Sequence, residues 1–418
     1  MIRADLVVRD LSEAATLAAG PVPRVGRAAG ELTRLERPAV AIAGGRFAWI
    51  GPERHLAGAV RLRSGGREVS GHGGTLVPGL VDAHTHALFA GDRAFELPLK
   101  IAGASYSEIA RQGGGLYSTV RATRRASDAE LLRETGGRLI RQGRLGSTSI
   151  EVKSGYALSH AGELRLLRLI PRLARHTGLT LVPTFLGAHA VAPEYAGRAD
   201  AYVELLVRRT LPIVAQEHLA RFCDVFCEPG FFSPRQSERL LRAAILLGLG
   251  VKVHAEEFVW SGGARVAARL RARSAEHLLS ASADDRDRLA RAGVTAVLLP
   301  ITAFTSSTTR RSPGREMVDA GVPVALGTDL SPNSWVEGMP LVLAHAVHGG
   351  RLTPAEALTA ATVNAAHAIG LEGSAGTVAV GRPADFAVFP LPSADHLGYR
   401  FDAHPELVYR QGKSISPP

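Results

Sequence analysis

The sequence predicts an α/β fold: a (β/α)8 TIM-like barrel with a small β-sandwich domain built from both chain termini. Two observations lead to this prediction. The middle of the chain alternates short apolar runs with amphipathic segments, which is typical of a parallel sheet wrapped by helices. Both ends instead carry short strand-like segments joined by glycine-containing turns. With 418 residues, 46% of them hydrophobic, the chain can bury a large core and a smaller one.

Apolar runs in the middle of the chain are typical of short strands. They cover, in chain order, residues 76–86, 147–155, 179–189, 223–230, 251–257, 272–278, 295–300 and 322–329. These are eight runs, the strand count of a (β/α)8 barrel. Amphipathic segments such as 128–143 and 237–250 lie between them, and the second ends on a glycine, as helices often do. We therefore expect a barrel over residues 79–374.

The outer segments have a different character. Residues 4–11 and 40–52 near one end, and 377–389 and 406–415 near the other, are typical of short strands joined by turns. We expect residues 1–78 and 375–418 to form the small β-domain together.

Composition limits the classes of partner. The net charge is +10, but the basic residues are nearly all Arg and are scattered among Asp and Glu without a dense basic run, which argues against nucleic-acid binding. No run approaches the roughly 18 apolar residues of a membrane span, and the first ten residues lack a signal pattern. Cys223 and Cys227 provide no disulfide framework. We expect a soluble, cytoplasmic protein that binds neither nucleic acid nor membranes.

The first barrel strand ends in His84-Thr85-His86. Side chains at i and i+2 of a strand project from the same face, so the two imidazoles can share one site. Neutral imidazoles suit a divalent metal, although solvent-facing or hydrogen-bonded histidines are the more common reason for this spacing when it stands alone. Further ligands must come from elsewhere in the chain.

More polar residues fall where the other predicted strands end. These residues are His189, His254, His277 and Asp329. Barrel enzymes build their sites at the C-terminal ends of the strands, so the clustering favours a common site. His84, His86 and His254 can each supply a nitrogen and Asp329 an oxygen, which leaves one position for water, as a catalytic metal requires.

The chain resembles the amidohydrolase superfamily and, within it, the imidazolonepropionase family. The stretch PGLVDAHTH, residues 78–86, marks only the superfamily. The combination of the Gly-rich loop at 113–127, EVKSGYAL at 151–158 and TFLGAHAVAPEY at 184–195 is more specific. Further matching stretches are VHAEE (253–257), EHLL (276–279), AVLLP (296–300), TDLSPNS (328–334) and TVNAAHAIGL (362–371).

The resemblance implies a metal centre with a single ion. His84, His86, His254 and Asp329 would hold one Zn2+ or Fe3+ ion per chain. The two-metal relatives use a carboxylated lysine on the fourth strand, whereas this fourth strand, 223–230, contains no lysine. Lys153, on the second strand, is therefore expected to be structural.

The implied reaction is the hydrolysis of 4-imidazolone-5-propanoate, a small anionic imidazolone, to N-formimidoyl-L-glutamate in histidine degradation. A metal-bound hydroxide would attack the cyclic amide. We expect Glu257 to take a proton and return one to the ring nitrogen, and His277 to orient the water or stabilise the oxyanion. Asp329 would share in this acid–base chemistry. Glu256, beside Glu257, is expected on the surface.

The resemblance also implies contacts with the substrate. Arg93 could bind its carboxylate bidentately, a geometry that Lys cannot reproduce. The glycines at 112–115 would let the backbone pass close to the substrate, and this loop lacks the Lys-Ser/Thr of a phosphate loop. At 331 and 333 this chain has Ser and Asn where many relatives have Asn and Gly. The other expected substrate contacts are Tyr106, Tyr156, His189, Glu257, Ser331, Asn333 and Ser334.

Two alternatives remain open at this point. A deaminase of a purine-like or pyrimidine-like ring would use the same His and Asp set but release ammonia. A noncatalytic amidohydrolase-like scaffold would bind no metal. The resemblance also suggests a homodimer, and a site of three His and one Asp accepts zinc or iron.

Overall fold

The computed structural model describes residues 1–103, 108–109, 112–305 and 310–415. The central sheet is parallel, and its neighbours follow the chain order. Its strands are β6 (Leu80–Asp82), β7 (Ser147–Lys153), β8 (Thr180–Ala188), β9 (Phe222–Cys227), β10 (Gly250–Ala255), β11 (Ser274–His277), β12 (Thr295–Leu298) and β13 (Val324–Leu326). The eight predicted barrel strands are therefore confirmed.

The first and last strands of this sheet meet and close the barrel. The backbone N–H of Ala83 donates to the Leu326 carbonyl at 3.2 Å, and that of His86 donates to the Leu330 carbonyl at 2.9 Å. The buried carboxylate of Asp82 accepts from the backbone N–H of Thr328 at 2.9 Å and from its hydroxyl at 2.6 Å. The closure brings the histidines after β6 next to the residues after β13.

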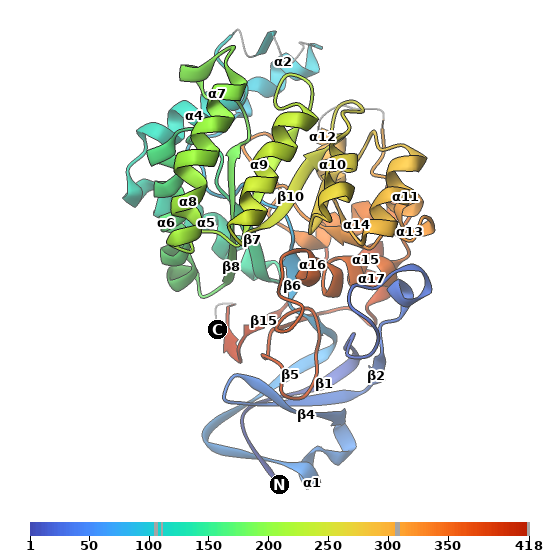
Figure 1. Ribbon diagram of the computed structural model, residues 1–418. Helices are drawn as coiled ribbons and strands as arrows, with labels where there is room; N and C mark the ends of the chain where they lie inside the picture. Colours follow the sequence, from blue (N-terminus) through green and yellow to red (C-terminus); the bar gives the residue numbers. More distant parts are fainter. Residues whose placement is uncertain (104–107, 110–111, 306–309, 416–418) are drawn as a thin grey trace.

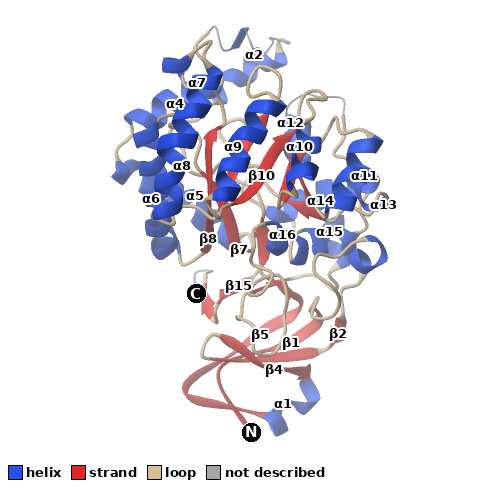
Figure 2. Ribbon diagram, viewed as in Figure 1, coloured by secondary structure: helices blue, strands red, loops and turns tan. Residues whose placement is uncertain are grey.

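Helices surround the barrel, with the strands inside (Figure 2). Ser127 begins α5 with a capping box: its side chain accepts a hydrogen bond from the Glu130 N–H, and the Glu130 side chain accepts one from the Ser127 N–H. The helices are α1 (Leu56–Ala59), α2 (Leu97–Ile101), α4 (Leu116–Arg125), α5 (Asp128–Arg144), α6 (His160–Thr177), α7 (Ala199–Leu205), α8 (Leu211–Gln216), α9 (Pro234–Leu246), α10 (Gly263–Leu270), α11 (Ala283–Ala292), α12 (Pro300–Thr305), α13 (Gly314–Asp319), α14 (Met339–His348), α15 (Pro354–Ala360), α16 (Val363–Ala368) and α17 (Asp395–Tyr399). Short helical turns lie at Gly26–Gly30, Glu53–His55, Ala94–Glu96, Pro193–Tyr195 and Leu206–Thr210.

The two chain ends form a second, mixed sheet below the barrel (Figure 1). Its strands are β1 (Ile2–Ala15), β2 (Arg34–Glu36), β3 (Pro38–Ala43), β4 (Arg46–Pro52), β5 (Val60–Pro78), β14 (Phe386–Phe389), β15 (Leu407–Arg410) and β16 (Lys413–Ser414). The strands predicted at both termini are present. They are hydrogen-bonded into one sheet in the order β16-β15-β14-β5-β1-β3-β4, with β2 on β1.

The long strand β5 differs from the sequence prediction. Its middle is polar and glycine-rich, so no apolar run marks it. It also includes residues 76–78, which the apolar run at 76–86 places in the first barrel strand. The two strands separate at Gly79, where the backbone passes so close to the Thr148 side chain of β7 that a Cβ atom would collide with it.

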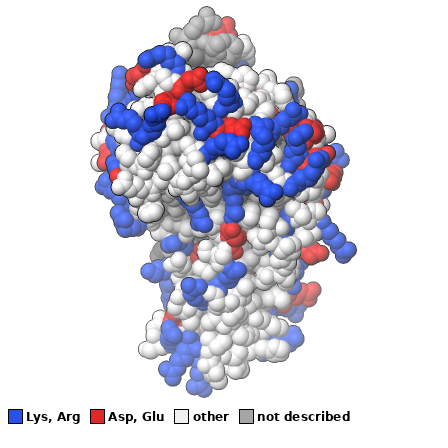
Figure 3. All heavy atoms as spheres, in the orientation of Figure 1, with Lys and Arg blue, Asp and Glu red and all other residues white. Residues whose placement is uncertain are grey.

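Positive and negative side chains are interspersed on the face shown in Figure 3. Many charged side chains of the protein are paired, as in the contact between Arg141 and Glu337 at 2.7 Å. In the described part of the chain, no helix is both long and apolar enough to cross a membrane. Cys223 and Cys227 are buried free thiols of β9.

Candidate active site

Four side chains converge where the barrel strands end. The Nε2 atom of His86 lies 3.1 Å from Nε2 of His84 and 3.3 Å from Nε2 of His254. The Oδ1 atom of Asp329 lies 3.3 Å from Nε2 of His84 and 3.4 Å from Nε2 of His86. All four residues are buried. The structure therefore brings together all four predicted metal ligands.

These distances fit a metal ion. Atoms at the corners of a tetrahedron around zinc, about 2.0–2.1 Å from the ion, lie roughly 3.3–3.4 Å from each other. Burial and the neighbouring imidazoles hold the pKa of His86 well below its ordinary value, so that this ring is neutral, as a ligand must be. One cation at this position would satisfy the three imidazole nitrogens and the Asp329 carboxylate at once.

The backbone at the site is held in unusual conformations. His277 has φ 69° and Asp329 has φ 53°, both in the left-handed region that non-glycine residues rarely adopt. Such positions cost about 1–3 kcal/mol each and are found at sites that fix a side chain precisely. The Thr302 hydroxyl of α12 also donates to Oδ2 of Asp329 at 2.7 Å, which leaves Oδ1 facing the histidines.

A pocket opens above these ligands and contains most of the predicted site. Its predicted members are His86, Arg93, Tyr156, His189, His254, Glu257, His277, Asp329, Ser331 and Asn333, and its other walls are Leu116, Phe226, Phe231 and Phe258. Tyr106 lies outside the described residues. Of the predicted site residues that the structure describes, His84 and Ser334 do not line the pocket.

Glu257 and His277 face each other in this pocket. Nε2 of His277 lies 3.5 Å from Oε2 of Glu257, and the Glu257 side chain is 12% exposed. Burial, with the negative charges of Asp329 and Glu228, raises the pKa of Glu257 well above its ordinary value. Burial lowers the pKa of His277 to about 3. The pair therefore combines a carboxyl group that binds a proton more readily than an exposed glutamate does with an imidazole that favours its neutral form.

His189 lies against the metal ligands. Its ring stacks on that of His86, with centroids 4.8 Å apart, and its Nδ1 donates to the Gly155 carbonyl at 3.2 Å. Burial lowers the pKa of His189 to about 3. Because Nδ1 carries the proton of the neutral ring, Nε2 is the atom left to accept a hydrogen bond. The Tyr156 ring packs next to it, with centroids 5.2 Å apart.

Arg93 does not stand alone in the pocket wall. Its Nε and Nη2 atoms donate to the two carboxylate oxygens of Glu96, both at 2.7 Å. Glu96 is fully buried and also accepts from the Gly115 N–H at 2.7 Å. A Cβ atom on Gly114 would lie 2.9 Å from Oε1 of Glu96, so the glycines let the backbone pass close to this carboxylate. One edge of the guanidinium is thus already occupied.

The residues that differ from the family pattern have their own partners. Lys100 donates from Nζ to Oδ1 of Asn333 at 2.7 Å. The Ser331 hydroxyl accepts from the Ser334 N–H at 3.1 Å. The Ser334 hydroxyl lies 3.4 Å from Oγ1 of Thr302, so this side chain lies behind Asp329. Ser331 and Asn333 belong to the pocket wall, and Ser334 supports it.

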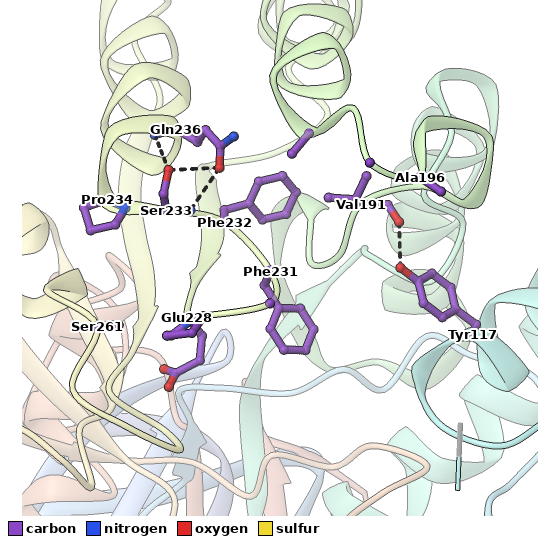
Figure 4. A pocket seen from close by; sticks show the side chains of 14 residues that line it. Tyr117, Val191, Ala196, Glu228, Phe231, Phe232, Ser233, Pro234, Gln236 and Ser261 are labelled. Atoms are coloured by element: carbon purple, nitrogen blue, oxygen red, sulfur yellow. Dashed lines mark hydrogen bonds between the residues drawn. The ribbon is translucent and has the colours of Figure 1, made fainter. Parts of the chain in front are cut away.

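A larger cavity of about 650 Å³ lies beside this pocket (Figure 4). Phe231 lines both spaces. Among the described residues that line the larger one, Glu228 is the only His, Cys, Asp or Glu, and it accepts from the backbone N–H groups of Glu257 and Val259 at 3.2 and 2.8 Å. We therefore place the chemistry in the smaller pocket, where the titratable groups converge.

Sequence reasoning missed several residues of the site and misplaced one. Glu256 is not on the surface: it is fully buried, and its carboxylate accepts from the N–H groups of Gly262 and Ala264 at the start of α10, at 2.8 and 2.9 Å. Glu96 had a signal, an opposite charge three residues after Arg93. No sequence signal marked Lys100 or Thr302, because their partners, Asn333 and Asp329, are distant in the chain.

The comparisons with known proteins point to one family. The model of the amidohydrolase family matches residues 260–415. The imidazolonepropionase of Symbiobacterium thermophilum is 46% identical to this chain over 94% of the chain and 93% of that protein. The imidazolonepropionase of Syntrophobacter fumaroxidans is 43% identical over 94% of this chain and 93% of that protein.

Solved structures share the fold at lower identity. An adenosine deaminase from Xanthomonas campestris with bound zinc has a TM-score of 0.71 at 19% identity, covering 99% of this chain and 93% of that one. Atrazine chlorohydrolase from Arthrobacter aurescens, complexed with zinc, has a TM-score of 0.69 at 17% identity, covering 98% and 94%. From the identity to the curated relatives over nearly the whole chain, the protein belongs to the imidazolonepropionase family of amidohydrolases.

Proposed function

We propose that this protein is a metal-dependent imidazolonepropionase, a hydrolase that opens the cyclic amide of 4-imidazolone-5-propanoate to N-formimidoyl-L-glutamate. The observation that carries the proposal is the convergence of three imidazole nitrogens and the Asp329 carboxylate at 3.1–3.4 Å, beneath a pocket that contains Glu257 and His277. Relatives named imidazolonepropionase at 38–46% identity support this substrate.

A metal ion bound by His84, His86, His254 and Asp329 would supply Lewis acidity that activates water near neutral pH. We propose one Zn2+ or Fe3+ ion per chain, because a site of three imidazoles and one carboxylate suits either ion. The zinc in two structural neighbours is in accord with this ligand set.

Glu257 is the proton-transfer residue of the proposed reaction. It takes a proton from the attacking water and delivers one to the ring nitrogen as the C–N bond breaks. Its raised pKa favours the second half of this role, because the carboxyl group holds a proton more readily than an exposed glutamate does. His277, 3.5 Å from Glu257, is positioned to orient the water and to donate to the developing oxyanion.

The opposite wall of the pocket would bind the negative end of the substrate. The Arg93 guanidinium, held by Glu96, lies in this wall, and Lys100 adds a second cation through its bond to Asn333. Charge-assisted hydrogen bonds of this kind favour a carboxylate such as the propionate group. Tyr156, His189 and Ser331 would then contact the ring and the amino-acid end, and Tyr106 and Ser334 remain predicted contacts. A homodimer and a cytoplasmic location also remain predictions from the sequence.

The test is a hydrolysis assay with fresh 4-imidazolone-5-propanoate and the metal-loaded protein, in which N-formimidoylglutamate and ammonia are followed in the same reaction. We expect N-formimidoylglutamate without ammonia, and about one zinc or iron ion per chain by elemental analysis. Ammonia release would indicate a deaminase instead. Decay of the substrate at its spontaneous rate only would refute the assigned substrate.

A further inference from the structure

Five charged side chains are fully buried inside the barrel. They are Glu151 and Lys153 of β7, Asp224 of β9, Lys252 of β10 and Glu276 of β11. Burying a charge is costly unless it is paired well, so a group of five requires a reason. None of them belongs to the described residues that line the substrate pocket, so the proposed chemistry does not use them directly.

The two lysines pair with the three carboxylates in different ways. Nζ of Lys153 lies 2.8 Å from Oδ2 of Asp224, 2.8 Å from Oε2 of Glu151 and 2.9 Å from Oε2 of Glu276. Nζ of Lys252 lies 2.6 Å from Oε1 of Glu151 and 2.9 Å from Oε1 of Glu276. Lys153 is therefore the only one of the two within ion-pair distance of Asp224.

Two of these carboxylates reach the back of the metal ligands. Oε2 of Glu276 lies 2.5 Å from Nδ1 of His84, and Oδ2 of Asp224 lies 2.9 Å from Nδ1 of His254. A carboxylate at Nδ1 fixes the ring orientation and the tautomer, which leaves the Nε2 lone pair for the metal. The two oxygens that face the histidines are the same two oxygens that Lys153 contacts.

We propose that Lys153 is a positioning residue for the metal: it holds the Asp224 and Glu276 carboxylates in place, and through them it orients His254 and His84. Three carboxylates enclosed together repel one another, and of the two buried lysines only Lys153 contacts all three. Without it, Asp224 and Glu276 would move apart, and the two imidazoles would lose the supports that aim Nε2 at the site. The proposal rests on the metal-dependent function proposed above.

Lys252 is a matched control for this role. It is equally buried and carries the same charge. Its contacts, however, are to the oxygens of Glu151 and Glu276 that do not face a histidine, and to the Ala83 carbonyl at 3.3 Å. Replacing either lysine by Met removes one buried charge at similar volume. Only Lys153→Met removes the contact shared by the two carboxylates that support the ligands.

The test measures metal binding apart from hydrolysis. Wild type, Lys153→Met and Lys252→Met are first compared by circular dichroism and thermal unfolding of the metal-free proteins. Each is then loaded with Co2+, and its visible absorption spectrum and its rate of Co2+ loss to a chelator are recorded. For Lys153→Met we expect an altered spectrum and Co2+ affinity lower by about 10–100-fold, the usual effect of losing such support. For Lys252→Met we expect a smaller change in both.

A wild-type spectrum and a wild-type rate of Co2+ loss in folded Lys153→Met would overturn the proposal, even if that variant were less stable. If Lys153→Met does not fold, the near-isosteric variants Asp224→Asn and Glu276→Gln replace it. Each should release Co2+ faster than wild type, and unchanged release in both would equally refute the proposal. If wild-type protein binds Co2+ but does not hydrolyse the imidazolone, the assigned substrate fails while the positioning role still stands or falls on the Co2+ data.

Discussion

The two sides of the candidate site are built in different ways. The metal side comes from strand ends: His84 and His86 follow β6, and His254 lies in β10. The Asp224 and Glu276 carboxylates behind these histidines are buried inside the barrel. The anion side comes from connecting segments, with Arg93 after the first strand and Asn333 after the last. The difference shows that the fold fixes the reaction centre rigidly, while substrate recognition is placed on segments that can vary without disturbing the barrel.

The metal side should be the less tolerant of change. Replacing His84 by Ala removes one ligand, so we expect loss of the bound metal and a fall in kcat/KM of about 10³-fold or more, since metal ions contribute several kcal/mol to such transition states. Metal content and turnover are measured together. His55→Ala, at an exposed position far along the chain from the barrel ligands, is the control and should match wild type. Full metal retention by His84→Ala would show that His84 is not a required ligand and that the metal side is not the less tolerant one.

Glu257 tests whether the metal alone accounts for the chemistry. Glu257→Gln keeps the shape but cannot exchange a proton, so we expect kcat to fall by about 10²–10⁴-fold with metal content unchanged. Glu256→Gln is the neighbouring control, because that carboxylate faces the start of α10 and should affect stability rather than turnover. If the two variants retained equal turnover, Glu257 would have no role in proton transfer.

The anion side should respond in KM rather than in kcat. Arg93→Lys keeps the charge but loses the two-pronged contact with Glu96 and the planar edge offered to a carboxylate. A charge-assisted hydrogen bond contributes about 1.5–3 kcal/mol, so KM should rise by roughly ten- to a hundredfold while kcat changes less. Steady-state kinetics at saturating and limiting substrate separate the two parameters. An unchanged KM would contradict the assignment of this wall to the propionate group.

The smallest effect concerns Lys100. Burial and the positive charge of Arg93 lower the pKa of Lys100 below its ordinary value. A lowered amine pKa means that the charge is lost at a lower pH than for an exposed lysine, so KM should begin to rise before the pH reaches the ordinary lysine value of about 10.4. Lys100→Met should have a higher KM at neutral pH and lack this rise. A parallel pH profile in both proteins would show that the titration belongs to another group.

Much of the metal side was predictable. His84 and His86 share a face because of the two-residue period of a strand, and the ends of parallel strands meet at one edge of the barrel. Glu256 shows the limit of this reasoning. It follows the same strand as Glu257, and the sequence alone does not tell which of two adjacent carboxylates turns into the pocket. The left-handed backbone of Glu256, with φ 52°, redirects the chain at this point.

By itself, the sequence determined the barrel, the strands contributed by both ends and the grouping of the four predicted metal ligands, because each of these depends on local periodicity or on which strand end a residue occupies. Only the tertiary structure decided the contacts between distant segments. Lys100 meets Asn333 across 233 positions, and Lys153 meets Asp224 across 71. Such pairs form because barrel closure and buried charge compensation act in space, and neither leaves a spacing that can be recognised along the chain.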